Sequence, residues 1–340
     1  MTIICDDNFL PWVEKYRPKY IEEIISHDQN ITTIKKLLCN QSLPHLLFFG
    51  SPGTGKTSTI MALANQIYGD NIKLMIMKLD ASDDRGITSV REDIKEFAEK
   101  TNIFQKGVRL IILDEVDSMT FDAQFALRRI IEKYSSSIRF CLICNYENKI
   151  IPAIRSRCTN FRFSNIDIIH IKNKLKQICI NEKIFFDNNI IETISILANG
   201  DLRKAINLLQ SITMNLINKN YNDYTNEELL ELCYNIACIP NKNEINTIIN
   251  TLINENHDFN KSYDIINNII INKCFSLLII LKELTFELIN NYLHINYISN
   301  IISELSDLEN MVTKSNFCDI YISALISIFK KYYYKEIKIQ

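Results

Sequence analysis

Short apolar runs alternate with amphipathic stretches along the first half of the chain. Four apolar runs have the length and composition of strands, at residues 45–50, 71–80, 108–117 and 138–146. The stretches between them carry apolar residues at helical spacing, at residues 56–69, 89–100 and 121–134. Buried strands linked by helices are typical of parallel sheets. The pattern therefore predicts an α/β domain with a mostly parallel sheet over residues 1–163.

The strand pattern ends after "FRFSNI", and from about residue 165 the apolar residues recur at helical spacing. Asparagine-rich breaks interrupt this pattern at residues 218–226 and 240–246. We interpret the end of the first break as a domain boundary, although both breaks can also be short low-complexity insertions. The prediction is a small helical domain over residues 164–226 and a larger one over residues 227–340.

The composition is that of a soluble globular protein, with 340 residues, 47% hydrophobic and 23% charged. No apolar run reaches the about 20 residues that cross a membrane, so we expect no membrane partner. The net charge of −2 gives no overall attraction to nucleic acids, and any such contact needs a local patch. The ten cysteines are scattered singly, which favours reduced thiols in an intracellular protein over a disulfide framework.

The segment "GSPGTGKT" (50–57) is a complete P-loop between a predicted strand and a predicted helix. Glycines let the backbone wrap around phosphates, and the start of the helix adds positive potential. Lys56 is expected to meet the β- and γ-phosphates, and Thr57 to bind Mg²⁺. The alternative is an ordinary glycine-rich turn, but all the required positions are filled.

Two adjacent acids end the third predicted strand. Asp114 is placed to reach the Mg²⁺ beside the P-loop, and Glu115 to polarise an attacking water. The alternative is a solvated acidic strand end that includes Asp117. Paired acids after a buried strand favour ATP hydrolysis over a small GTPase.

Two further polar residues are candidates for the same site. Asn145 follows the fourth predicted strand, where its amide can orient the water or touch the γ-phosphate; it can also be a turn residue. Arg203 lies in the first turn of a predicted helix with Asp201 as its N-cap. Arg203 is placed to fold onto the nucleotide, with a surface ion pair as the alternative.

The segment "IIPAIRSRCTNF" (150–161) carries Arg155 and Arg157 with no carboxylate close by in sequence. From these residues alone, we expect either arginine to form a salt bridge within the domain. In the nearby "CLIC" (141–144), the two cysteines point to opposite faces of a strand, so we expect buried core thiols rather than a zinc or redox site.

Together these motifs resemble an AAA+ ATPase and, more narrowly, the small subunits of the clamp loader replication factor C. The similarity is dense over the first 210 residues and looser beyond them. The residues that carry it are "PWVEKYRP" (11–18), "FFGSPGTGKTST" (48–59), "LDASDDRGITSVRE" (79–92), "LDEVDSMTFDAQFALRRIIEKY" (113–134), "RFCLICNYENKIIPAIRSRC" (139–158) and "GDLRKAINLLQ" (200–210). The stretches "RFCLICNY" and "SRCTNFRF" are most similar to the branch numbered 3 in yeast and 5 in humans.

The resemblance implies a fold and a nucleotide site. The fold is an α/β P-loop AAA+ module, then a small helical lid domain and an all-α C-terminal collar domain. The cofactors are ATP and Mg²⁺, the latter held by Thr57 and Asp114. Catalysis is assigned to Lys56, Asp114 and Glu115. The nucleotide-binding residues are Val13, Arg17, Gly50, Ser51, Pro52, Gly53, Thr54, Gly55, Lys56, Thr57, Ser58, Asn145 and Arg203.

For Arg157 the resemblance implies an arginine finger that acts on the ATP of a neighbouring subunit, while Arg155 is structural. It also implies that Arg85, Arg91 and Lys95 contact the DNA backbone without sequence specificity. For each of these three cations, an ion pair on a helix surface is an equal alternative. The segment from Ser118 to Arg129 is expected to face the sliding clamp.

The implied function is that of an ATPase in a five-membered ring of replication factor C subunits. The ring would use ATP to open the sliding clamp PCNA and load it onto primer–template DNA in the nucleus, during replication and repair, with hydrolysis stimulated by DNA and clamp. One alternative is a subunit that binds nucleotide structurally and hydrolyses little. Others are a checkpoint or cohesion clamp loader and a different AAA+ machine, such as a Holliday-junction motor or an unfoldase.

Overall fold

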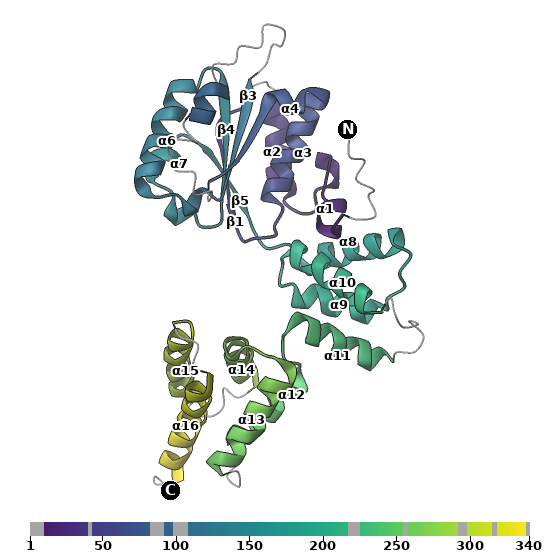
Figure 1. Ribbon diagram of the computed structural model, residues 1–340, viewed down its shortest axis with the longest axis vertical. Coiled ribbons are helices and arrows are strands. Elements are labelled where there is room, and N and C mark those ends of the chain that lie inside the picture. The colour runs from purple at the N-terminus through teal and green to yellow at the C-terminus, as the bar shows by residue number, and fades with distance from the viewer. Residues whose placement is uncertain are drawn as a thin grey trace. The chain divides into compact units, whose positions relative to one another are not determined.

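The computed structural model describes residues 10–39, 43–81, 92–97, 108–216, 225–253, 258–291, 298–314 and 318–337. The chain divides into two compact units, residues 1–210 and 211–340 (Figure 1). Each unit has its own buried core, and we describe each by itself. The three-domain division made from the sequence stays a prediction.

The first unit is built on a five-stranded sheet in the order β2-β3-β4-β1-β5, in which all neighbouring strands are parallel. The strands are β1 (Leu46–Gly50), β2 (Ile76–Asp80), β3 (Arg109–Asp114), β4 (Ile138–Cys144) and β5 (Thr159–Phe163). This confirms the predicted parallel α/β sheet. Because β1 lies between β4 and β5, and β3 lies beside β4, their carboxyl ends meet at one edge.

Helices cover both faces of the sheet (Figure 1). Helices α2 (Asp28–Cys39) and α3 (Lys56–Tyr68) lie on one face, and α6 (Phe121–Tyr134) and α7 (Pro152–Arg155) lie on the other. The alternation of side chains along each strand divides the core between these faces. On β1, Leu46 and Phe48 join the cluster under α2 and α3, whereas Leu47 joins the cluster under α6.

Two strand predictions were wrong in detail. The strand predicted at 71–80 begins only at Ile76, because residues Gly69–Asn71 form a 3-10 turn and α4 (Ile72–Met75) follows. Five residues of the predicted run pair with β3. The apolar residues before them form the helix α4 instead. The edge strand β5 was not predicted separately, because its polar Thr159, Asn160 and Arg162 leave a weak strand signal.

Other predicted elements agree closely with the structure. Helices α3 and α6 have nearly the predicted bounds, and β1, β3 and β4 lie within the predicted runs. The described part of the helix predicted at 89–100, residues 92–97, is helical and is anchored by the buried Ile94. In β4, Cys141 and Cys144 are both buried, which confirms the burial predicted for "CLIC".

Three helices follow the sheet: α8 (Ile168–Asn181), α9 (Asn188–Leu197) and α10 (Leu202–Leu216). Each is amphipathic, and the inward positions of α8 are Ile171, Leu175 and Ile178. At the start of α10, the Asp201 carboxylate accepts a hydrogen bond from the backbone N–H of Lys204 at 3.0 Å. This confirms Asp201 as the predicted N-cap.

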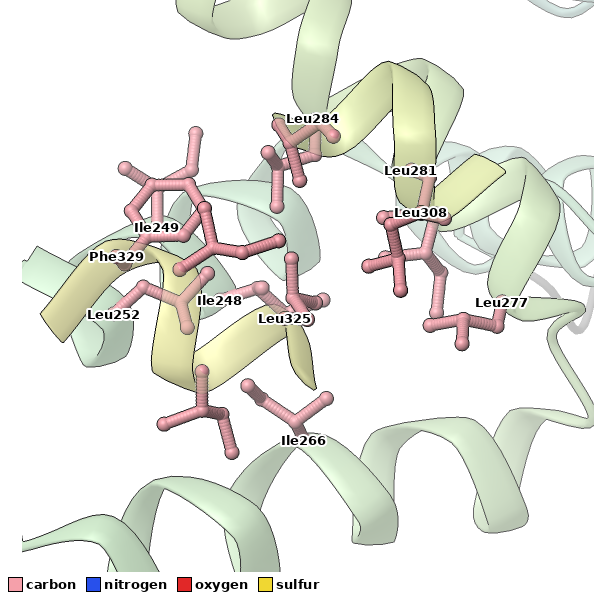
Figure 2. Packing of buried hydrophobic residues seen from close by; sticks show 14 of the residues in the cluster. Ile248, Ile249, Leu252, Ile266, Leu277, Leu281, Leu284, Leu308, Leu325 and Phe329 are labelled. Atoms are coloured by element: carbon pink, nitrogen blue, oxygen red, sulfur yellow. The ribbon is translucent and has the colours of Figure 1, made fainter. Parts of the chain in front are cut away.

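The second unit is helical throughout its described residues. Its helices are α11 (Asn226–Ala237), α12 (Lys242–Ile253), α13 (Phe259–Lys273), α14 (Leu277–Asn291), α15 (Ile298–Val312) and α16 (Cys318–Ile337). Figure 2 shows the core shared by α12 to α16, in which Ile249, Leu252, Leu284, Leu325 and Phe329 are buried. Within the described residues no single helix is long and apolar enough to span a membrane, and only the bent pair α13–α14 reaches that composition together.

Candidate active site

The P-loop lies between β1 and α3, and its glycines have backbone angles that other residues rarely adopt. Gly50 has a φ of 141°, and a Cβ atom there would lie 1.9 Å from the backbone oxygen of Phe163. Gly53 has a φ of 68°, and its Cβ would lie 1.7 Å from Oδ1 of Asp201. The loop is therefore packed against both the neighbouring strand β5 and the start of α10.

Lys56 is a buried cation that contacts neutral oxygens. The residue is only 7% exposed. Its Nζ donates to the backbone oxygens of Gly50 at 2.7 Å and Ser51 at 2.8 Å, and to Oδ1 of Asn145 at 2.9 Å. Burial lowers the pKa of the Lys56 ammonium, and the charge of Arg203 acts in the same direction. A desolvated ammonium with neutral partners attracts an anion, and polyphosphate suits it.

Thr57 and Asp114 bring two oxygen ligands together beside Lys56. The Thr57 hydroxyl donates to Oδ2 of Asp114 at 3.0 Å. Hydroxyl and carboxylate oxygens are the ligands that Mg²⁺ prefers. The pair therefore fits a magnesium site in chemistry and in position at the carboxyl edge of the sheet.

Glu115 occupies an unusual backbone conformation directly after β3. Its φ is 54°, in the left-handed region that non-glycine residues seldom adopt. Its backbone oxygen accepts from the N–H of Ser118 at 2.9 Å and from the Ser118 hydroxyl at 2.7 Å, which hold this turn. Asp114 and Glu115 both line the same pocket.

Asp117 has a structural task that the sequence did not reveal. Its Oδ2 accepts hydrogen bonds from the backbone N–H groups of Asn145 and Tyr146, each at 3.2 Å. The loop after β3 is thus tied to the end of β4, and Asn145 is held where it meets Lys56. The sequence interpretation placed Asp117 only in an acidic strand end.

One pocket of about 210 Å³ collects most of the residues assigned to the nucleotide. Its lining includes Val13, Arg17, Pro52, Gly53, Thr54, Gly55, Lys56, Thr57, Ser58, Asp114, Glu115, Asn145 and Arg203. Gly50 and Ser51 lie outside this lining and face Lys56 with their carbonyls. The lining also contains apolar residues that sequence reasoning missed, among them Ile24, Ile25 and Ile206. They come from segments far apart in the chain, so no local pattern connects them.

The start of α10 touches the P-loop directly. The backbone N–H of Leu202 donates to the Gly53 oxygen at 3.2 Å, and Arg203 enters the pocket from the next position. Movement of α10 would therefore displace both the P-loop and the Arg203 side chain that enters the pocket.

Arg157 lies outside this pocket. Its Nη2 is 2.5 Å from Oε1 of Glu132 on α6, and its Nη1 donates to the backbone oxygen of Ala153 at 2.7 Å. Arg155 pairs with Glu147 at 3.3 Å. Both arginines thus form a salt bridge within the domain, which is the use expected from these residues alone.

Helix α6 begins shortly after Asp114 and Glu115, and it displays apolar side chains within the segment predicted to face the clamp. Phe121 is 67% exposed and Phe125 is 49% exposed. Between them, the buried Gln124 accepts from the Ile151 N–H at 2.9 Å and donates to the Lys149 oxygen at 3.0 Å. Gln124 therefore links α6 to the segment that leads to Arg157, and sequence reasoning missed it.

The residues predicted to contact DNA are only partly described. Lys95 is exposed on the helical residues 92–97. Arg85 and Arg91 lie outside the described residues.

Comparisons with known proteins agree with this geometry. A family model described as "ATPase family associated with various cellular activities (AAA)" matches residues 46–165, and one described as "RCF1/5-like, AAA+ ATPase lid domain" matches residues 173–214. Among solved structures, the RuvB Holliday junction branch migration motor of Thermotoga maritima aligns with a TM-score of 0.53. That alignment has 16% identity and covers 74% of this chain and 85% of the motor, so it supports the AAA+ fold alone.

Curated relatives match almost the whole chain. Replication factor C subunit 3 of Saccharomyces cerevisiae is 38% identical, over 94% of this chain and 93% of its own length. Replication factor C subunit 5 of Homo sapiens is 40% identical, over 94% and 92% respectively. The probable replication factor C subunit 5 of Dictyostelium discoideum is 42% identical, over 94% and 90%. The chain therefore belongs to the replication factor C small-subunit family of AAA+ ATPases, in the branch numbered 3 in yeast and 5 in humans.

Proposed function

We propose that this chain is an ATP-hydrolysing subunit of a five-membered replication factor C ring in the nucleus. The ring opens PCNA and loads it onto primer–template DNA. The observation that carries the proposal is the convergence of the P-loop, Asp114, Glu115, Asn145 and Arg203 on one pocket. Family membership supplies the partners, and the pocket supplies the chemistry.

Binding of ATP uses the P-loop and the buried ammonium of Lys56. The β- and γ-phosphates take the place of the neutral oxygens that now surround Lys56, and backbone N–H groups at the start of α3 add to the attraction. Val13 and Arg17 form the wall at the base side of the pocket. Thr57 and Asp114 hold Mg²⁺, which when bound neutralises phosphate charge.

Hydrolysis uses residues at the ends of β3 and β4. Glu115 accepts the proton of the attacking water as general base, which contributes about 10²–10⁴ in rate. Asn145, already fixed by Asp117 and Lys56, orients that water or the γ-phosphate. Arg203 contacts the nucleotide from α10 and reports its state through the lid.

Arg157 acts on the ATP of the neighbouring subunit. Its position outside its own pocket supports this role, because a finger for the same chain would have to reach that pocket. The phosphate of the neighbour then replaces Glu132 as the partner of the guanidinium. A cation placed at the developing charge contributes roughly 10³–10⁵ in rate.

Contacts with DNA and clamp use other surfaces. Lys95, with Arg85 and Arg91, meets the DNA backbone inside the ring, where sequence-blind binding requires only cations along a groove. The segment from Ser118 to Arg129 contacts PCNA, and the exposed Phe121 and Phe125 on α6 support this assignment.

The test is a reconstituted complex that carries Glu115→Gln. We expect ATP to bind at this subunit but one ATP per complex to remain unhydrolysed in a single turnover with clamp and DNA. Lys56→Ala is the comparison variant, and it should abolish ATP binding at this subunit. Unchanged hydrolysis with Glu115→Gln would instead identify a structural nucleotide subunit. Failure to copurify with any sliding clamp would contradict the clamp-loading proposal.

A further inference from the structure

The segment of residues 12–17 contributes Val13, Glu14, Tyr16 and Arg17 to the wall of the pocket, and it is fastened to the lid helices α8 and α10. This segment contains α1 (Trp12–Lys15), a helix of only four residues with no side-chain cap. Such a short helix has little stability of its own, so its position depends on what holds it. Among the residues that hold it is Glu182, which belongs to none of the sequence motifs.

A single carboxylate oxygen of Glu182 receives two of these contacts. Oε1 of Glu182 accepts from the Lys15 ammonium at 2.6 Å and from the Tyr16 hydroxyl at 2.6 Å. The Lys15 and Glu182 side chains are 26% and 19% exposed, so this ion pair is largely shielded from water. Glu182 is the C-cap of α8, and its own backbone N–H bonds to the Ile178 oxygen, which fixes it to the lid.

A second contact holds the other end of α1. The backbone N–H of Trp12 donates to Oε1 of Gln210 on α10 at 3.1 Å, and the Trp12 side chain is buried. The segment therefore follows the lid helices α8 and α10. On the side of the sheet domain, the Lys19 oxygen accepts from the Asn65 amide at 3.1 Å.

The protonation states of Glu182 and Tyr16 at neutral pH favour these hydrogen bonds. Burial works to raise the pKa of Glu182, but the hydrogen bonds from Lys15 and Tyr16 outweigh it and hold that pKa below its ordinary value. Burial, reinforced by Glu182, raises the pKa of Tyr16, so its hydroxyl remains a donor. The carboxylate is thus ionised and both of its partners can donate.

We infer that Glu182 is a positioning residue for ATP binding, because it holds the base-side wall of the pocket to the lid. Tyr16 belongs both to this contact and to the pocket lining, beside Val13 and Arg17. Loss of Glu182 frees the wall without touching Lys56 or Glu115, which lie on other segments. The consequence is weaker ATP binding with an unchanged chemical step. This inference rests on the proposed function of the pocket.

The experiment compares Glu182→Ala, Glu182→Gln and a matched control in the full chain and in the reconstituted complex. Glu192 is the control residue, because its carboxylate pairs with Lys172 at 2.6 Å between α8 and α9 of the same lid. The readouts are the Kd for ATP by titration, and kcat and KM for hydrolysis. A thermal melt of each variant shows whether it is folded.

We expect Glu182→Ala to raise the Kd and the KM for ATP about tenfold while kcat at saturating ATP stays within twofold. Glu182→Gln keeps an acceptor for Tyr16 and should restore part of the affinity. Glu192→Ala should change neither constant. The inference is overturned if folded Glu182→Ala and Glu182→Gln bind ATP like the wild type, or if Glu192→Ala weakens binding equally.

Failure of the inference and failure of the proposed function give different results. If wild-type protein binds ATP and Lys56→Ala abolishes that binding, the pocket is a nucleotide site whatever Glu182 does. If Lys56→Ala binds ATP as well as the wild type, the proposed site itself is wrong.

Discussion

The guanidinium of Arg157 and the carboxylate of Glu132 form an ion pair of 2.5 Å within one chain. The same Oε1 of Glu132 also lies 3.0 Å from Nε of Arg128, one turn earlier on α6. Hydrogen bonding from Arg128, helped by Arg157, lowers the pKa of Glu132, so the carboxylate is charged at neutral pH. The proposed finger therefore pairs with a carboxylate of its own chain, which it shares with Arg128, until a phosphate from a neighbour competes for it.

The first prediction concerns Arg157→Ala in the reconstituted ring. We expect hydrolysis at the neighbouring site to fall by up to about 10³–10⁵, because the developing phosphate charge loses its cation. ATP binding at this chain's own pocket should persist. Single-turnover hydrolysis assigned to each subunit measures both, with Arg162→Ala, the loss of an exposed arginine on β5, as the control. A neighbour that hydrolyses at full speed would contradict the finger.

The second prediction concerns Gly53→Ala. The new Cβ would lie 1.7 Å from the Asp201 carboxylate, so the start of α10 must move away from the P-loop. We expect ATP binding to weaken at least tenfold. Gly69→Ala is the matched control, since its φ of 50° is also positive, no described atom lies within 4 Å of the new Cβ, and Gly69 does not line the pocket. Adding Asp201→Ala to Gly53→Ala removes the clashing atoms and should recover part of the loss; no recovery would refute the steric explanation.

The third prediction concerns the buried Gln124, which is 1% exposed. Gln124→Ala leaves the Ile151 N–H and the Lys149 oxygen without their partner, at a cost of about 1–3 kcal/mol. The free energy of unfolding, measured by urea denaturation, should fall by that amount. Gln29→Ala, on the exposed surface of α2, should stay within about 0.5 kcal/mol of the wild type. Equal effects of the two variants would mean that the Gln124 bonds add no stability.

The fourth prediction concerns the reactivity of cysteines. Burial raises the pKa of the Cys144 and Cys158 thiols to about 12 and that of Cys179 to about 11. A raised pKa means that the reactive thiolate forms only as the pH rises toward that value, so these thiols should resist alkylation at pH 7.5. The exposed Cys238 and Cys274 should react before these buried thiols. Peptide mapping after brief iodoacetamide treatment measures the order, and rapid labelling of Cys144 in the folded chain would contradict it.

Much of the fold was predictable because its signals are local. Helices α3 and α6 carry apolar residues at helical spacing, and β1, β3 and β4 are short apolar runs. The errors arose where the local signal was ambiguous. The apolar run at 71–80 suits a helix as well as a strand, and only its pairing with β3 shows that the strand begins at Ile76. The polar edge strand β5 is recognised by its pairing with β1 rather than by its composition.

The sequence by itself determined the P-loop, the paired acids after β3 and the family, because each depends on contiguous residues whose spacing carries the chemistry. Tertiary structure alone decided that Asn145 meets Lys56, that Glu182 holds Lys15 and Tyr16, and that Glu132 pairs with Arg157. These contacts join residues up to 167 positions apart. Local periodicity carries no information about such pairs, since they form only when the strand order and the lid packing bring distant segments together.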